Sequence, residues 1–292
     1  MAIKTAPAER AFGYFNVFLL SVFSIMCVYP MIHILFASFS DPNALMRHQG
    51  ILLRPLGFTL EGYRLTFRNP GIMSGYANTL FYVGVGTTIN ISVTSLAAYS
   101  LSRKRVLFRN PIMFMIVFTM FFSGGIIPLF LIVRGLGLLN TRIIMVIHNT
   151  VSAWNLIVMR TGFAAVPDSL EESAKMDGAN DFTVLFRIIL PLSKAVIAVM
   201  VLFYGVGHWN SWLPAVIFLR DRGLYPLQLI LREILIIQEE AAILPAVPAE
   251  DMMYRMLVRY STVIIATVPI LFSYPFLQRY FVKGVMIGSI KG

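Results

Sequence analysis

Residues 167–191 read PDSLEESAKMDGANDFTVLFRIILP and lie between two long uncharged segments, 143–159 and 195–219. Ser169 and Glu172 have the spacing of a capping box, in which the side chains at the first and fourth positions bind each other's backbone N–H groups. This spacing predicts that a short helix starts at Ser169.

The rest of this stretch predicts a second short helix. Gly178 can adopt the left-handed conformation that ends the first helix. Asn180 or Asp181 can then cap a helix over residues 182–190, which we expect to end before Pro191 because proline has no N–H to donate. The result is a compact helix-turn-helix with little side-chain bulk. It can fit a partner's groove, or it can be an amphipathic connector on the membrane surface, and the spacing favours neither.

Long apolar segments flank this helix-turn-helix along the chain. A helix needs about 20 apolar residues to cross a hydrocarbon core of about 30 Å. Six uncharged segments meet or approach that length, which predicts an all-α integral membrane protein with one transmembrane domain over residues 1–292. We place the six helices near residues 12–36, 77–101, 110–133, 142–162, 194–218 and 260–281.

The composition agrees with a membrane protein. Of the 292 residues, 58% are hydrophobic and 13% are charged, whereas soluble domains carry about 25% charged residues. A soluble enzyme is therefore excluded. The net charge of +10 would indicate nucleic-acid binding in a soluble protein, but here the charges lie between apolar segments, so we expect no nucleic-acid partner.

The basic residues predict the orientation of the chain. Short cytoplasmic loops of membrane proteins are rich in Lys and Arg. The loop after the second predicted span carries four such residues (Arg103, Lys104, Arg105 and Arg109), so we expect it to face the cytoplasm. Six spans then place both termini and the 167–191 loop on the same side.

Several chemistries are absent from the sequence. It contains no GxxxxGK[ST] phosphate-binding loop, so any ATP must be bound by a partner. Its four histidines and single cysteine do not have the spacing of metal ligands, and we expect no metal. No carboxylate lies inside a predicted span, which argues against an ion-coupled secondary carrier.

A polar and aromatic cluster lies within the fifth predicted span. It comprises His208, Trp209, Asn210, Ser211 and Trp212. Tryptophan rings can stack on sugars while an amide binds hydroxyl groups, so His208, Trp209, Asn210 and Trp212 are candidates for a substrate path. The alternatives are an aromatic belt at the membrane interface and, for the histidine, a hydrogen bond to a neighbouring helix.

The 167–191 loop resembles the EAA loop of permease subunits in binding-protein-dependent ABC importers. The motif E-A-A, then G, then I-x-L-P appears here as Glu172-Ser173-Ala174, Gly178 and 188–191, with Ser173 in place of an alanine. Further motifs resemble the carbohydrate-uptake, maltose-type branch and its six-span permease. The segments Gly124–Pro128 and Tyr225–Leu229 resemble the subgroup that handles oligosaccharides from complex polysaccharides, including the smaller permease of alginate importers.

The resemblance implies a type I importer fold in a bacterial inner membrane. It implies a heterodimer with a homologous permease, two ATPase subunits that bind ATP and Mg²⁺, and an extracytoplasmic solute-binding protein. The substrate would be an oligosaccharide, including acidic ones such as alginate fragments. A permease for another solute of the same superfamily remains an alternative. The residues implied in coupling to the ATPases are Glu172, Ser173, Ala174, Asp177, Gly178 and Pro191. In maltose-type relatives the partner permease supplies most substrate contacts.

Overall fold

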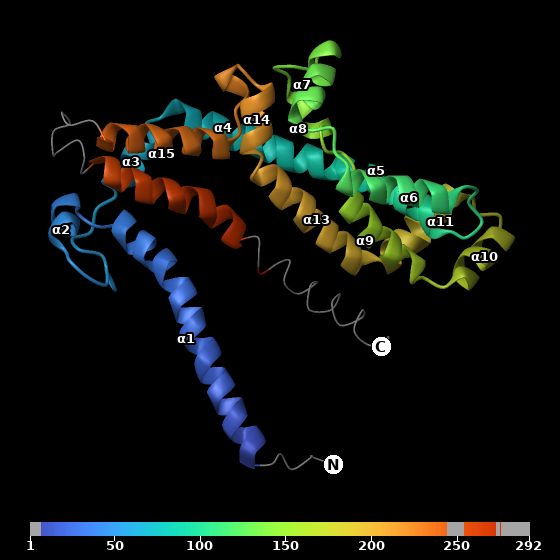
Figure 1. The fold of residues 1–292 in the computed structure, drawn as a ribbon, viewed down its shortest axis with the longest axis horizontal. Helices are drawn as coiled ribbons and strands as arrows, with labels where there is room; N and C mark the ends of the chain where they lie inside the picture. The colour runs from blue at the N-terminus through green and yellow to red at the C-terminus, as the bar shows by residue number, and fades with distance from the viewer. Residues whose placement is uncertain (1–6, 244–253, 273–274, 276–292) are drawn as a thin grey trace. The chain divides into compact units, whose positions relative to one another are not determined.

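The computed structural model describes residues 7–243, 254–272 and 275, and within them the regular structure is helical (Figure 1). The chain divides into two compact units. One comprises the described residues up to Asn69 and those from Glu233 to Thr267, and the other is centred on Pro70–Arg232.

The first unit contains a long apolar helix and several short ones. Helix α1 (Pro7–Ser38) covers the predicted span 12–36, and its apolar side chains are largely exposed, as expected of a surface that faces lipid. Helices α2 (Pro42–Arg47) and α3 (Glu61–Phe67) follow. The helix Tyr254–Phe272 contacts α3 through a buried hydrogen bond of 2.8 Å between the hydroxyls of Thr66 and Ser261.

The second unit begins with a helix over Pro70–Ser102 that contains one wider turn. It comprises α4 (Pro70–Phe81), a π-helical turn (Tyr82–Gly86) and α5 (Thr87–Ser102). The remaining elements are α6 (Arg109–Phe121), α7 (Ile126–Gly135), α8 (Arg142–Ile147), α9 (Ala153–Ala164), α10 (Asp168–Met176), α11 (Asp181–Val184), a second π-helical turn (Leu185–Ile189), α12 (Leu190–Leu192), α13 (Lys194–Trp209), α14 (Trp212–Phe218) and a 3-10 turn (Arg222–Leu224). Helix α15 (Leu227–Ile243) starts in this unit, and its residues from Glu233 onward belong to the first unit.

Several predicted spans are interrupted. Three described helices are long and apolar enough to cross a membrane, or up to five if two bent pairs are each one span. One pair is α6 and α7, bent by 113°, and the other ends with α13, bent by 87°. The 142–162 segment consists of α8 and α9 with a break at 148–152. The six-span count therefore stays a prediction.

The core beneath α10 and α11 is built by three helices that lie side by side, α5, α9 and α13 (Figure 1). The apolar side chains buried there include Phe163, Leu185, Ile189 and Met200, all at 1% exposure or less. The short helices α10 and α11 pack on this core, which holds them in position.

Gly86, in the first π-helical turn, allows α13 to approach closely. A Cβ at this position would lie 2.4 Å from His208 Nε2, whereas a Cβ at Gly84 would meet nothing within 4 Å. We expect Gly86→Ala to destabilise the protein by about 1–3 kcal/mol, because the added methyl group overpacks a filled interface. Gly84→Ala is the matched control and should be neutral. Thermal unfolding of the purified protein measures both, and equal melting temperatures would refute the packing role.

Candidate functional site

Helix α10 starts one residue earlier than the sequence indicates. It begins at Asp168 with Pro167 at the capping position, and no side chain caps it. The predicted capping box at Ser169 and Glu172 is therefore wrong. Pro167 has φ −57° and ψ 134°, and a proline with this fixed φ leads directly into a first turn. Ser169 thus lies inside that turn rather than at its boundary.

The turn after α10 has the predicted form. Gly178 has φ +84°, and its N–H donates to Lys175 O at 3.0 Å while that of Ala179 donates to Ala174 O at 2.9 Å. These two bonds define a Schellman motif, which satisfies the last carbonyls of the helix. The prediction that Gly178 ends the first helix is confirmed.

The second helix is capped as predicted but ends later. Asn180 Oδ1 accepts a hydrogen bond of 2.8 Å from Thr183 N–H, which makes Asn180 the cap. The expected end before Pro191 is wrong, because the chain remains helical to Leu192 through the π-helical turn Leu185–Ile189 and α12. Pro191 has no N–H, so the normal i to i−4 hydrogen bond is lost at this residue. The wider π turn lies directly before it.

Most residues implied in coupling form an exposed surface on α10 and its turn. Glu172, Ser173, Asp177 and Gly178 are exposed, and Ala174 is half-buried against the core below. Pro191 is also exposed, at the far end of the second helical segment. The exposed apolar side chain of Met176, at 89% exposure, adds to this surface. We call α10 with the turn 177–180 the knob.

The knob is anchored by a buried carboxylate, that of Glu171. Its side chain is only 7% exposed, and three cations surround it. Arg103 Nε lies 3.3 Å from Glu171 Oε2, and Arg105 and Lys175 lie 2.8 and 2.9 Å from Oε1. A buried charge of this kind requires such partners, because desolvation of an unpaired charge costs several kcal/mol.

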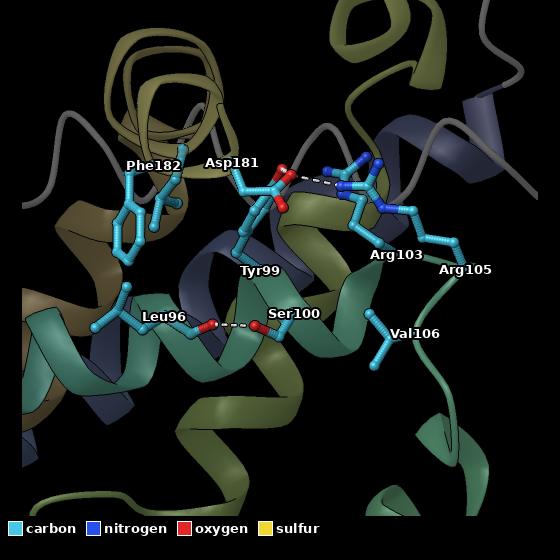
Figure 2. A pocket seen from close by; sticks show the side chains of 9 residues that line it. Leu96, Tyr99, Ser100, Arg103, Arg105, Val106, Asp181 and Phe182 are labelled. Carbon is cyan, nitrogen blue, oxygen red and sulfur yellow. Dashed lines mark hydrogen bonds and ion pairs between the residues drawn. The ribbon is translucent and has the colours of Figure 1, made fainter. Parts of the chain in front are cut away.

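A second carboxylate, that of Asp181, links the same cations to α11. Asp181 Oδ1 lies 2.6 Å from Arg105 and 2.7 Å from Lys175, and Figure 2 shows this carboxylate facing the arginine side chains beyond the end of α5. Burial alone would lower the pKa of Lys175, but its hydrogen bonds to Asp181 and Glu171 outweigh that effect and raise the pKa above 10.5. The lysine is therefore charged at neutral pH.

Arg103 connects the knob to α5 and α9. Its guanidinium is 5% exposed, donates to Phe163 O at 2.9 Å at the end of α9, and pairs with Asp168 at 3.1 Å. It also lies 5.4 Å from the centre of the Tyr99 ring in α5. A movement of the knob therefore acts directly on α5 and α9.

Glu172 is among the residues predicted to take part in coupling, whereas its neighbour Glu171 is not. The missed signal was the four-residue spacing between Glu171 and Lys175, which places the two side chains on one helix face. The burial of Glu171 depends on Arg103 and Arg105, which come from a different part of the chain.

The four candidate substrate-path residues lie in three different environments. His208 Nε2 donates to Asn90 Oδ1 at 2.9 Å, which matches the alternative of a hydrogen bond to a neighbouring helix. Trp209 is buried against Tyr76, and the face of the Trp212 ring carries the Arg232 guanidinium at 3.5 Å. Asn210 is exposed and lines a polar cavity together with His208. Their part in a substrate path stays a prediction.

Comparisons with known proteins agree with this architecture. Residues 90–287 match the family described as "Binding-protein-dependent transport system inner membrane component". The chain is 39% identical over 278 residues to the polygalacturonan/rhamnogalacturonan transport system permease protein YtcP of Bacillus subtilis (strain 168), covering 94% of this chain and 96% of that protein. It is 37% identical to Protein LplC of the same organism, covering 99% and 98%.

A solved structure has the same fold. It is described as the crystal structure of a bacterial ABC transporter involved in the import of the acidic polysaccharide alginate. The TM-score is 0.86 and the identity 31%, and the match covers 95% of this chain and 99% of the matched chain.

Proposed function

The chain belongs to the family of binding-protein-dependent transport system inner membrane components, and from that premise we propose that it is one permease subunit of an ATP-driven importer for oligosaccharides from acidic polysaccharides. ATP hydrolysis then takes place on partner subunits, which agrees with the lack of a phosphate-binding loop in the sequence. The full transporter contains a homologous permease, two ATPase subunits and an extracytoplasmic binding protein.

The observation that carries the coupling part of this proposal is the knob. It exposes Glu172, Asp177 and Met176 while Glu171 ties it to Arg103 beside α5. An ATPase subunit that binds the exposed side of the knob can move α5 and α9 through the contacts on its buried side. Such a rigid link is what conversion of ATPase closure into an inward- or outward-open state requires.

The proposed substrate class follows from two of the relatives. Polygalacturonan and alginate, the polymers named for YtcP and for the solved structure, are both built from uronic acids. A relative at 26% identity, from Halalkalibacterium halodurans, is named for arabinooligosaccharides, which are neutral. The higher identities thus favour an acidic oligosaccharide as the substrate of this chain.

The proposed orientation places the knob in the cytoplasm of a bacterium, with both termini on that side. The support is the basic loop at residues 103–109, since such loops remain inside. In this orientation Met176 lies on the side of the ATPase subunits, and Leu136, on the loop after α7, lies on the other side of the membrane.

Uptake by the complete transporter in proteoliposomes tests the substrate proposal. We expect ATP-dependent uptake of a labelled oligogalacturonide in the presence of the binding protein. Unlabelled uronate oligosaccharides should compete, and a neutral arabinooligosaccharide at the same concentration should compete at least about tenfold less, a difference of about 1.4 kcal/mol in binding. Equal competition by the neutral sugar would refute the acidic substrate class.

A further inference from the structure

Two interruptions of the helices in the second unit meet at one cavity. The first lies between α8 and α9, at 148–152, and the second between α13 and α14, at Asn210 and Ser211. The cavity has a volume of about 230 Å³ and is lined from both interruptions and from α5. In membranes, non-helical backbone is tolerated only where protein buries it or where it lines a water-filled space. The two breaks are therefore compatible with an aqueous path.

The lining of this cavity combines polar side chains with apolar ones such as Phe203 and Pro214, and its titratable side chains include two histidines, His148 and His208. Amide and hydroxyl groups of Asn149, Ser152, Asn155 and Asn210 contribute to it, and no Asp, Glu, Lys or Arg does so within the described part of the chain. Amides and hydroxyls both donate and accept hydrogen bonds, which is the pattern that a sugar hydroxyl matches. A free carboxylate would instead need an opposite charge, and the two lining histidines are fewer than the three or four protein ligands of a typical zinc site.

One buried side chain in the lining has no partner. Asn155 is 7% exposed, and its amide makes no hydrogen bond within the described residues. By contrast, the amide nitrogen of Asn90 in the same cavity donates to Asn149 O and Thr150 O at 2.8 and 2.9 Å. Unlike the Asn90 amide nitrogen, the Asn155 amide is therefore available to a ligand or to water in the cavity.

In the proposed orientation, the cavity lies near the middle of the membrane. Asn90 is separated from Ser102, at the basic end of α5, by about 18 Å at a rise of about 1.5 Å per residue. The hydrocarbon core is about 30 Å thick. Substrate sites of transporters are common at this depth, where interrupted helices expose their polar backbone.

We propose that this cavity is a sugar subsite of the translocation path, in which Asn155 and Ser152 bind the hydroxyl groups of one ring of the passing oligosaccharide. The proposal rests on the proposed function. The volume is below the roughly 300–1,000 Å³ of pockets for drug-sized ligands, so the subsite takes a single ring. Since the lining holds no Lys or Arg, it binds hydroxyl groups and leaves the uronate carboxylates to other surfaces.

Thiol protection in the complete transporter tests the subsite. In a Cys27→Ser background, Ser152→Cys should react with a small methanethiosulfonate reagent. In the vanadate-trapped complex with oligogalacturonide-loaded binding protein, its labelling should be at least about fivefold slower than in the same complex trapped without sugar. Thr161→Cys is the matched control, because it lies on the same helix α9 and is exposed. Its labelling should not respond to sugar.

Uptake by Asn155→Ala is the second measurement. We expect the rate to fall about tenfold, which corresponds to a loss of about 1.4 kcal/mol, while Thr161→Ala transports at the parental rate. Absence of protection at residue 152, or unchanged uptake by Asn155→Ala, would mean that the cavity holds only water and would overturn the proposal. A parental transporter that takes up no oligosaccharide at all would refute the proposed function instead.

Discussion

Gly178→Val is expected to uncouple ATP hydrolysis from uptake while the membrane helices remain inserted. Gly178 has φ +84°, and a Cβ there would meet nothing within 4 Å of this chain. A β-branched residue in this conformation costs about 1–3 kcal/mol, and its side chain would project from the knob toward the ATPase. We therefore expect weaker retention of the ATPase subunits and loss of sugar-stimulated hydrolysis and uptake.

Two other variants separate the causes of this effect. Gly137 also has positive φ, +67°, and open space around its Cβ position, but it lies in the turn after α7. Gly137→Val should carry similar strain without uncoupling. Gly178→Asn tolerates positive φ better than Val but adds bulk, so it isolates the steric part. Normal ATPase retention, stimulated hydrolysis and uptake in Gly178→Val would mean that the knob is an ordinary connector.

Glu171→Gln is expected to release the knob from α5 and α9. The substitution leaves the 5%-exposed guanidinium of Arg103 without its buried counter-charge. Breaking a buried ion pair costs about 3–5 kcal/mol, and we expect about 3 because Asp168 still pairs with Arg103. Hydrogen exchange of the α10 amides in the purified complex should then be about 100-fold faster.

Glu172→Gln is the matched control for this variant. Glu172 is adjacent in sequence but exposed, so the exchange rate of α10 should stay at the parental value while ATPase coupling weakens. Identical exchange in the Glu171→Gln and parental complexes would show that the ion pairs do not hold the knob.

The structure of residues 167–191 could be predicted from the sequence where it depends on neighbouring residues alone. Gly178 and Asn180 act on their own turn, and both have the expected roles. The start at Ser169 was wrong because the helix begins at Asp168, directly after Pro167 at the capping position. The end before Pro191 was wrong because a π-helical turn accommodates the proline. Each error lies at an element boundary, where neighbouring residues compete for the same role.

Features that depend on distant parts of the chain could not be predicted. The burial of Glu171 requires Arg103, and the pairing of Asn90 with His208 requires the close approach at Gly86. The breaks at 148–152 and 210–211 lie within uncharged segments, and hydropathy reports composition rather than backbone geometry. These are the features that build the knob's anchor and the polar cavity.

Site-specific cross-linking in intact cells tests most directly whether the knob is where ATPase subunits act on this chain. A photoreactive amino acid replaces Met176, which is 89% exposed on α10, or, as the control, Leu136, which is 67% exposed after α7. We expect a cross-link from position 176 to an ATPase subunit and none from position 136. An ATPase cross-link from 136 but not from 176, or from neither position in a transporting cell, would contradict it.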